Sequence, residues 1–272
     1  MQGPIGIFDS GYGGLTVMKE IVRKLPQYDY LYLGDNARTP YGNRSFETVY
    51  EYTLQAVKWF FSKGCPLVVL ACNTASAKAL RSIQQRDLPV LDPSKRVLGV
   101  IRPTTEVIGS YSQTKHVGLL ATSGTVASDS YKIETEKFFP EVKLFQQACP
   151  MWVPLVENDE YNNEGADYFI KKCLGQLLGQ SDSIDTILLA CTHYPLLIDK
   201  IKSNIPAGIK VISQAEIIAA SLSDYLNRHS EIENKLSKKG NKDFYTTDSA
   251  TDFNRQAKKF YGSTISSVQV HL

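Results

Sequence analysis

Two cysteines of this chain stand in contexts that suit acid–base chemistry. Cys72 ends an apolar run and precedes polar residues typical of helix N-termini, and Cys191 stands in the same context. The two segments read Val-Val-Leu-Ala-Cys-Asn-Thr over 68–74 and Ile-Leu-Leu-Ala-Cys-Thr-His over 187–193. Such a run predicts a buried strand that ends where a helix begins. We therefore expect both thiols at the carboxyl ends of strands, where open α/β sheets bind ligands.

A pair of thiols that faces one substrate suits the inversion of a carbon centre. This reaction needs a base on one face of the substrate and an acid on the other, with the roles exchanged in the reverse direction. Helix N-termini would help, because their free N–H groups bind carboxylates and lower the pKa of a nearby thiol. Alternatively, Cys72 and Cys191 are small buried hydrophobic residues, which is usual for an isolated cysteine. Their equivalent contexts favour a function.

Removal of an α-proton from an amino acid also requires that the site stabilise an enolate-like carboxylate. Preorganised hydrogen-bond donors supply much of this stabilisation in enzymes. Asn73, Thr74, Thr192 and Ser10 have suitable donors and lie next to the thiols or at the end of the first predicted strand. We expect them in the same site as the thiols.

Three ionisable residues are candidates for assisting the thiols. Asp9 ends the first predicted strand, where it either caps the next helix or assists Cys72. His193 lies two residues beyond Cys191, so it is either a structural histidine or the partner of that thiol. Glu157 follows the apolar segment Val-Pro-Leu-Val and is a weaker candidate, because a surface glutamate is equally consistent with its position.

Other patterns argue against a dinucleotide, a disulfide framework and a structural zinc site. The glycines after Asp9 do not complete G-x-G-x-x-G, because Thr16 occupies the last position. We expect them to let the backbone approach a small ligand. The five cysteines are odd in number and no two form C-x-x-C. Cys65, Cys149 and Cys173 lack polar contexts, and we interpret them as packing residues.

Strands and helices alternate over about 210 residues, as is typical of a parallel α/β sheet with right-handed crossovers. The predicted strands of this part are 5–8, 30–33, 67–71, 117–121, 142–146 and 186–190, and the predicted helices are 16–24, 45–63, 76–86, 128–138, 165–178 and 195–203. The tail predicts strands at 210–213, 244–247 and 267–271 and helices at 215–231 and 252–260.

The chain also contains two internal repeats. Residues 5–11 resemble 117–124, and 68–74 resemble 187–193, in the same order and at nearly the same spacing. The shared Ala-Cys pair is not explained by the general likeness of α/β strands, so we predict two similar halves. We expect the second domain to cover 99–210. The first would comprise 1–98 together with 211–272, because the tail has no counterpart in the second half.

Composition excludes several classes of function. The chain has 272 residues, of which 43% are hydrophobic, enough for one large core or two modest ones. The formal net charge is only +2 and no long basic stripe is present, so we expect no nucleic-acid partner. No apolar stretch reaches the roughly 18 residues of a membrane span, and no basic leader precedes an apolar run. We expect a cytoplasmic protein without membrane association.

Five motifs occur along about residues 1–215. They are Gly-Ile-Phe-Asp-Ser-Gly-Tyr-Gly-Gly-Leu-Thr-Val (6–17), Gly-Asp-Asn-Ala-Arg-Thr-Pro-Tyr-Gly (34–42), Ala-Cys-Asn-Thr-Ala-Ser (71–76), Ala-Thr-Ser-Gly-Thr (121–125) and Cys-Thr-His-Tyr-Pro-Leu-Leu (191–197). In content and order they resemble the motifs of glutamate racemases in the aspartate/glutamate racemase family. Each motif alone is weak evidence, whereas the five in order are specific.

The resemblance implies two α/β domains related by pseudo-twofold symmetry, with the active site in the cleft between them. It also implies an isomerase that needs no pyridoxal phosphate, metal or nucleotide, and a homodimer whose D-glutamate feeds peptidoglycan synthesis. Cys72 would deprotonate D-glutamate with help from Asp9, and Cys191 would deprotonate L-glutamate with help from His193 and Glu157. The residues that the resemblance assigns to substrate binding are Asp9, Ser10, Tyr41, Gly42, Asn73, Thr74, Thr122, Thr125, Thr192 and His193.

The chain departs from the family pattern at two places. Arg102-Pro103 stands where many members have Glu-Pro, and Ser213-Gln214 stands where a pair containing Asp is common. Both departures bear on contacts between domains or subunits more than on chemistry. Three alternatives remain open: a racemase of aspartate or another amino acid, a Cys–His acyl-transfer enzyme built on Cys191 and His193, and a carboxylate-binding module without catalysis.

Overall fold

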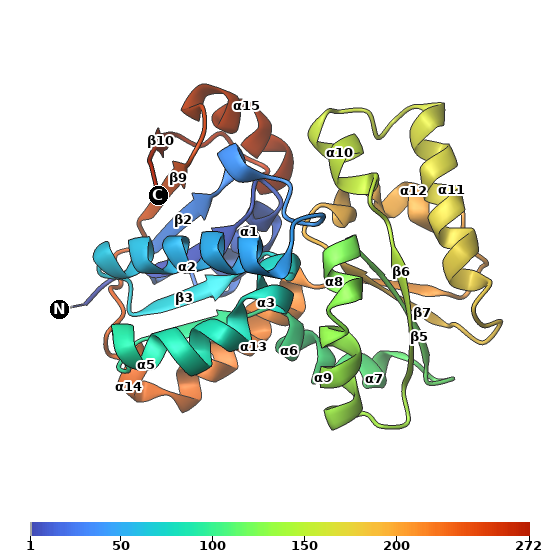
Figure 1. Cartoon of the computed structure of the whole chain (residues 1–272), viewed down its shortest axis with the longest axis horizontal. Helices are drawn as coiled ribbons and strands as arrows, with labels where there is room; N and C mark the ends of the chain where they lie inside the picture. The colour runs from blue at the N-terminus through green and yellow to red at the C-terminus, as the bar shows by residue number, and fades with distance from the viewer. Residues whose placement is uncertain (1) are drawn as a thin grey trace.

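The computed structural model describes residues 2–272 and contains two parallel β-sheets surrounded by helices (Figure 1). The larger sheet has the strand order β10-β9-β2-β1-β3-β4, and the smaller sheet has the order β6-β5-β7-β8. The strands are β1 (Ile5–Asp9), β2 (Tyr30–Gly34), β3 (Leu67–Leu70), β4 (Arg96–Gly99), β5 (His116–Ala121), β6 (Lys143–Ala148), β7 (Thr186–Ala190), β8 (Lys210–Ser213), β9 (Lys242–Thr246) and β10 (Ser267–Gln269).

The helices are short near the site and longer where they cover the sheets. The helices are α1 (Gly14–Lys24), α2 (Phe46–Ser62), α3 (Asn73–Lys78), α4 (Leu80–Ser82), α5 (Leu88–Leu91), α6 (Ile101–Thr105), α7 (Ile108–Tyr111), α8 (Ser123–Ala127), α9 (Ser130–Phe138), α10 (Trp152–Glu157), α11 (Glu164–Leu178), α12 (Ile198–Lys202), α13 (Ala215–Arg228), α14 (Ser230–Glu233) and α15 (Ala250–Tyr261). Single turns occur at η1 (Asn36–Arg38), η2 (Ile83–Asp87) and η3 (Tyr194–Leu197).

Side chains that alternate along the strands give the larger sheet two buried faces. Ile5, Ile7 and Val69 belong to the same core as the apolar residues of α1, α13 and α15. Phe8 and Leu70, which point the other way, pack with the apolar residues of α2 and α3. Helices on both faces explain why the strands read as continuous apolar runs rather than as alternating ones.

The two sheets share one strand order. In the larger sheet β1 lies between β2 and β3, and β4 follows β3. In the smaller sheet β5 lies between β6 and β7, and β8 follows β7. Thus β1 to β4 correspond in order to β5 to β8, and the segments after β3 and β7 are equivalent. The predicted fold class, two similar parallel α/β units, is confirmed.

The tail of the chain divides between the two sheets. β8, which the predicted division placed at the start of the segment 211–272, pairs with β7 of the smaller sheet. The expectation that the tail has no partner in the second half is therefore wrong for this strand, which is the counterpart of β4. The chain then returns along α13, and β9 pairs with β2 while β10 pairs with β9.

Several helices differ from the prediction. The helix expected over 76–86 is a series of short pieces, α3, α4 and η2, and α5 follows them. The helix expected over 195–203 begins with the 3₁₀ turn η3, and the short strand β4 was not predicted. None of the helices in residues 2–272 combines the length and the apolar character that crossing a membrane requires.

Candidate active site

A pocket lies where the carboxyl ends of β1, β3, β5 and β7 meet. Its cavity volume is about 40 Å³. Two adjacent strands of each sheet therefore supply it through the segments that follow them. The residues that line it are Ser10, Thr39, Pro40, Tyr41, Gly42, Asn43, Cys72, Asn73, Thr74, Thr122, Pro150, Val153, Pro154, Cys191, Thr192 and His193.

Cys72 reaches the pocket from the junction of β3 and α3. Its Sγ accepts a hydrogen bond from Ala75 N–H at 3.5 Å, so the thiol caps α3, and it donates to Ser10 Oγ at 3.6 Å. Burial, and to a lesser extent the Asp9 carboxylate, raise the pKa of Cys72 to about 12. In the free pocket Cys72 is therefore a protonated thiol at neutral pH.

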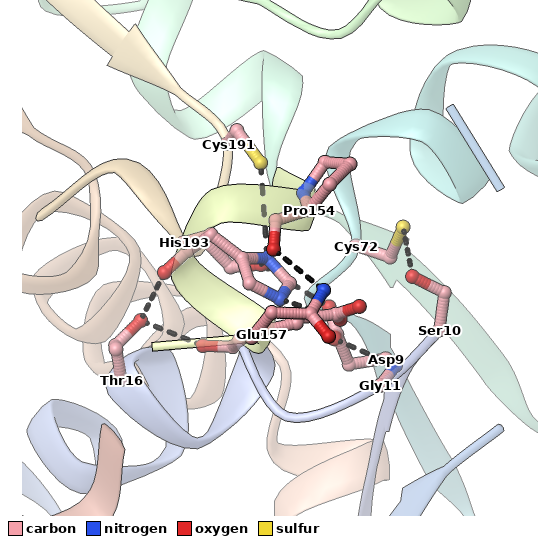
Figure 2. A network of polar contacts seen from close by, with 12 residues as sticks. Asp9, Ser10, Gly11, Thr16, Cys72, Pro154, Glu157, Cys191 and His193 are labelled. Carbon is pink, nitrogen blue, oxygen red and sulfur yellow. Dashed lines mark hydrogen bonds and ion pairs between the residues drawn. The ribbon is translucent and has the colours of Figure 1, made fainter. Parts of the chain in front are cut away.

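Cys191 reaches the same pocket from the end of β7 and contacts an imidazole (Figure 2). Its Sγ lies 3.9 Å from His193 Nδ1, and the other ring nitrogen, Nε2, lies 3.0 Å from Glu157 Oε1. Burial by itself lowers the pKa of His193, but the contacts with Cys191 and Glu157 raise it to about 10. His193 is therefore a buried imidazolium at neutral pH, with Glu157 as its counterion.

Asp9 ends β1 and lies behind the pocket. It is fully buried, and its Oδ2 accepts from Gly11 N–H at 3.0 Å while its Oδ1 accepts from the Thr192 hydroxyl at 3.5 Å. Burial raises the pKa of Asp9, and the nearby His193 charge opposes this rise. Within residues 2–272 no hydrogen bond joins Asp9 to Cys72, and the influence of Asp9 on that thiol is electrostatic.

The glycines after β1 allow the first half to pack against the Cys191 segment. A Cβ on Gly13 would lie 2.2 Å from Thr192 Oγ1 and 2.6 Å from His193 Nδ1, which no side chain could tolerate. Thr16 Oγ1 donates to the Thr192 carbonyl at 3.2 Å and so holds the same segment. The glycine-rich turn therefore serves close packing at the site.

Three threonine hydroxyls from the two halves meet at one side of the pocket. Thr74 Oγ1 lies 2.9 Å from Thr122 Oγ1, which lies 3.1 Å from Thr125 Oγ1. Thr122 also caps α8 by accepting from Thr125 N–H. The Gly42 carbonyl accepts from Gly124 N–H at 2.8 Å, which joins the loop after β2 to the same helix. This side of the pocket presents hydroxyl groups at a helix N-terminus, which suits an anionic group.

A buried carboxylate holds the loop that carries Tyr41. Asp35 accepts hydrogen bonds from the hydroxyls of Tyr41 and Thr247 and forms an ion pair with Arg38. Burial, together with the Asp35 charge, raises the pKa of Tyr41, so the phenol stays neutral. The loop residues 39–43 can then line the pocket in a defined position.

The arrangement supports proton transfer at a bound substrate. Two thiols face one pocket, one beside a serine hydroxyl and the other beside an imidazolium–carboxylate pair. Groups of this kind can take a proton from a carbon atom and return one to it. Hydroxyl, amide and helix N-terminal N–H groups around them can bind a carboxylate and stabilise the charge that develops on it.

A family model described as Asp/Glu/Hydantoin racemase matches residues 5–222. The chain belongs to this racemase family. Residues 5–222 include both thiols, His193 and every residue that lines the pocket. The enzyme is therefore an isomerase.

Relatives of the racemase match it over nearly the whole chain. A protein named glutamate racemase from Geobacter metallireducens is 38% identical over 97% of this chain and 94% of its own. The crystal structure of a glutamate racemase isoform from Bacillus anthracis superposes with a TM-score of 0.89 at 34% identity, over 99% of this chain and 98% of that one. A glutamate racemase from Francisella tularensis in complex with D-glutamate gives 0.87 at 26% identity, over 100% and 98%.

The racemase brings most residues singled out in the sequence to the pocket. Ten of them line it: Ser10, Tyr41, Gly42, Cys72, Asn73, Thr74, Thr122, Cys191, Thr192 and His193. The other three do not line the pocket, but each contacts a residue that does. Asp9 accepts a hydrogen bond from Thr192, Thr125 contacts Thr122, and Glu157 contacts His193. Their positions suit roles that act through the lining residues.

Sequence reasoning missed two sets of lining residues. Thr39, Pro40 and Asn43 flank the Tyr41-Gly42 pair, so that motif could have pointed to them. Pro150 lies just before α10, and Val153 and Pro154 lie in its first turn. Only the apolar segment before Glu157 gave a signal for these residues.

The remaining cysteines lie outside the pocket. Cys65, Cys149 and Cys173 are free thiols buried in the apolar cores. Among residues 2–272 no group of three or more His, Cys, Asp and Glu side chains is arranged to hold a metal ion.

Proposed function

We propose that this racemase interconverts L- and D-glutamate by a two-base mechanism that needs no cofactor. Cys72 removes the α-proton of D-glutamate, and Cys191 removes that of L-glutamate. The observation that carries the proposal is that two thiols, from equivalent places in two similar halves, line one pocket. The identity of the substrate is supported by the names of relatives that match nearly the whole chain.

The reaction consists of two proton transfers. For L-glutamate, the Cys191 thiolate takes the α-proton, and the electron pair of the broken C–H bond moves into the α-carboxylate. The Cys72 thiol then gives its proton to the opposite face of the carbon. The products are D-glutamate, a Cys191 thiol and a Cys72 thiolate, which is the state that D-glutamate requires for the reverse reaction.

The surroundings of the two thiols suit this starting state. The imidazolium of His193 places a positive charge 3.9 Å from Cys191 Sγ, where it can offset negative charge that develops during the proton transfer. The raised pKa of Cys72 keeps that thiol protonated and ready to act as the acid. This arrangement supports Cys72 as the acid when L-glutamate is the substrate.

Neutral donors would hold the two carboxylates of glutamate. The described residues that line the pocket include no Lys or Arg. We assign the binding role to Ser10, Asn73, the hydroxyls of Thr74 and Thr122, and backbone N–H groups at the start of α3. Such donors stabilise the developing enolate without placing a second charge next to the thiols.

The test is incubation of the purified protein with L-glutamate in heavy water, without added cofactor. Circular dichroism follows inversion, and proton NMR follows deuterium at the α-carbon. Loss of the circular dichroism signal together with α-deuteration is expected. Exchange with aspartate or another amino acid but not glutamate would assign a sister activity. No exchange with any amino acid would favour an acyl-transfer enzyme or a binding module.

The wider role follows from the family resemblance and belongs to the same proposal. D-Glutamate from this reaction would supply peptidoglycan synthesis in the cytoplasm, and the enzyme would act as a homodimer. We also propose that the two sheets mark two domains, with the second extending through β8. Light scattering on the purified protein tests the dimer, and limited proteolysis at the crossovers tests the domain boundaries.

A further inference from the structure

A closed ring of hydrogen bonds holds the side chain of Asn73, the residue that follows Cys72. Asn73 Nδ2 donates to Gln214 Oε1 at 2.9 Å, and Tyr131 OH donates to Asn73 Oδ1 at 2.6 Å. Gln214 Nε2 donates to Tyr131 OH and closes the ring. All three side chains are buried, and of the three only Asn73 lines the pocket.

A fourth residue sets the direction of every bond in the ring. The Thr104 hydroxyl donates to the Val100 carbonyl at 3.0 Å, so its oxygen can only accept from Gln214 Nε2, which lies at 2.8 Å. Gln214 must therefore turn its NH₂ group to Thr104 and Tyr131 and its oxygen to Asn73. Asn73 in turn must present NH₂ to Gln214 and oxygen to Tyr131.

The ring joins the two halves at the places where the chain passes between them. Asn73 begins α3 of the first half, and Tyr131 lies on α9 of the second (Figure 1). Thr104 lies on α6, which leads the chain into the second half, and Gln214 lies between β8 and α13, which leads it back. Gln214 also belongs to the Ser213-Gln214 pair, which stands where the family pattern commonly has a pair containing Asp.

The geometry points to Gln214 and Tyr131 as positioning residues that act on the reaction through Asn73. With one N–H and the carbonyl engaged, the Asn73 amide cannot rotate, and its second N–H remains available in the pocket. A fixed donor stabilises charge on a bound carboxylate without having to reorient during the reaction. The inference rests on the proposed function, because it takes glutamate as the substrate that Asn73 binds.

The test is a double-mutant cycle. Tyr131→Phe and Gln214→Met each break the ring with little change in volume, and each is combined with Asn73→Ala. Because the hydrogen bond of Asn73 is to a charged carboxylate, each single change should lower kcat/KM for glutamate by roughly tenfold. In the Asn73→Ala background the same changes should alter kcat/KM by less than about twofold. Exchange of the α-proton in heavy water keeps slow variants measurable.

Tyr30→Phe is the matched control for a purely structural effect. Tyr30 is also fully buried, and its hydroxyl makes one hydrogen bond, to the Leu25 carbonyl at 2.6 Å, away from the pocket. It should lower Tm as Tyr131→Phe does but leave kcat/KM unchanged. The inference would be overturned if the losses of kcat/KM caused by Tyr131→Phe and Gln214→Met added fully to the loss caused by Asn73→Ala. This outcome counts against the inference alone when the wild type still racemises glutamate. A wild type that leaves glutamate unchanged would instead overturn the proposed function.

Discussion

His193 and Glu157 form a partly buried ion pair, with Nε2 and Oε1 3.0 Å apart, on the side of the imidazole remote from Cys191. The carboxylate does not touch the pocket, yet it contacts the group that does. Glu157 thus acts on the Cys191 thiol through the charge of His193.

The first prediction concerns the alkaline limb of the pH profile. His193 has a pKa raised to about 10, so its charge is present at neutral pH and is lost as the pH rises through that value. Glu157→Gln removes one of the contacts that raise it, so the charge should be lost at lower pH. The fall of kcat/KM at alkaline pH should shift to lower pH in this variant. Glu136→Gln, an exposed change on α9, should leave the profile in place.

The second prediction separates the two thiols. Enantiomers have equal free energy in water, so kcat/KM must be the same in both directions for every variant, and a one-sided defect appears only in α-proton exchange. Cys72→Ser should lose racemisation by orders of magnitude, because a serine hydroxyl is a much weaker acid, but should still exchange the α-proton of L-glutamate. Cys191→Ser should do the opposite. Cys65→Ala should retain both activities, and normal racemisation by either serine variant would exclude two bases.

The third prediction uses the carboxyl group of Asp9. Asp9→Asn keeps the shape of the side chain but removes the charge that acts on Cys72. If Asp9 assists Cys72, exchange of the α-proton of D-glutamate should slow more than exchange of the α-proton of L-glutamate. NMR of each enantiomer in heavy water measures both. Equal slowing would mean that Asp9 acts instead through its hydrogen bond with Thr192.

The fourth prediction tests the packing of the glycine turn. Gly13→Ala would place a methyl group against Thr192 and His193 and must displace the segment that carries Cys191. We expect a loss of activity of tenfold or more, with a change in Tm. Gly175→Ala is the matched control, because nothing lies within 4 Å of its Cβ position on α11. It should stabilise the protein by about 0.5–1 kcal/mol without changing activity.

The fifth prediction concerns stability in acid. Partial burial would raise the pKa of Asp185, but hydrogen bonds from the Ser112 hydroxyl and the N–H groups of Gln113 and Thr114 lower it to about 2. Its contribution is present above the unfolded pKa near 3.8 and is lost as the pH falls towards 2. Asp185→Asn should cost on the order of 1–2 kcal/mol at neutral pH and less in acid. Chemical denaturation at a series of pH values measures this, and a cost independent of pH would contradict it.

The sequence predicts the strands of this protein better than its short helices. β1, β3 and β7 read clearly because they are buried on both faces, and the thiols follow two of them. β4 is a short edge strand that begins with Arg96, so it lacks an apolar run. The pieces from α3 to α5 contain Pro89 and a π turn, and the helical pattern alone does not reveal such interruptions.

The sequence predicts those site residues that are reactive in type and directly follow a predicted strand. Cys72, Cys191 and His193 lie in local motifs and were found from spacing and context. Pro150 and Val153 line the pocket because α10 folds over it, and this depends on tertiary packing. The hydrogen-bonded ring of Asn73, Tyr131 and Gln214 was not predictable either. Together with Thr104, its residues come from four separate segments of the chain.

The shared strand order has an evolutionary consequence. A single half could present only one thiol, so a half-length ancestor would have needed two copies, with identical surroundings for both thiols across the twofold axis. Once both copies lay in one gene, each side could mutate alone. The present chain carries His193 beside Cys191 and Ser10 beside Cys72, a divergence that a symmetric dimer of identical chains could not have made.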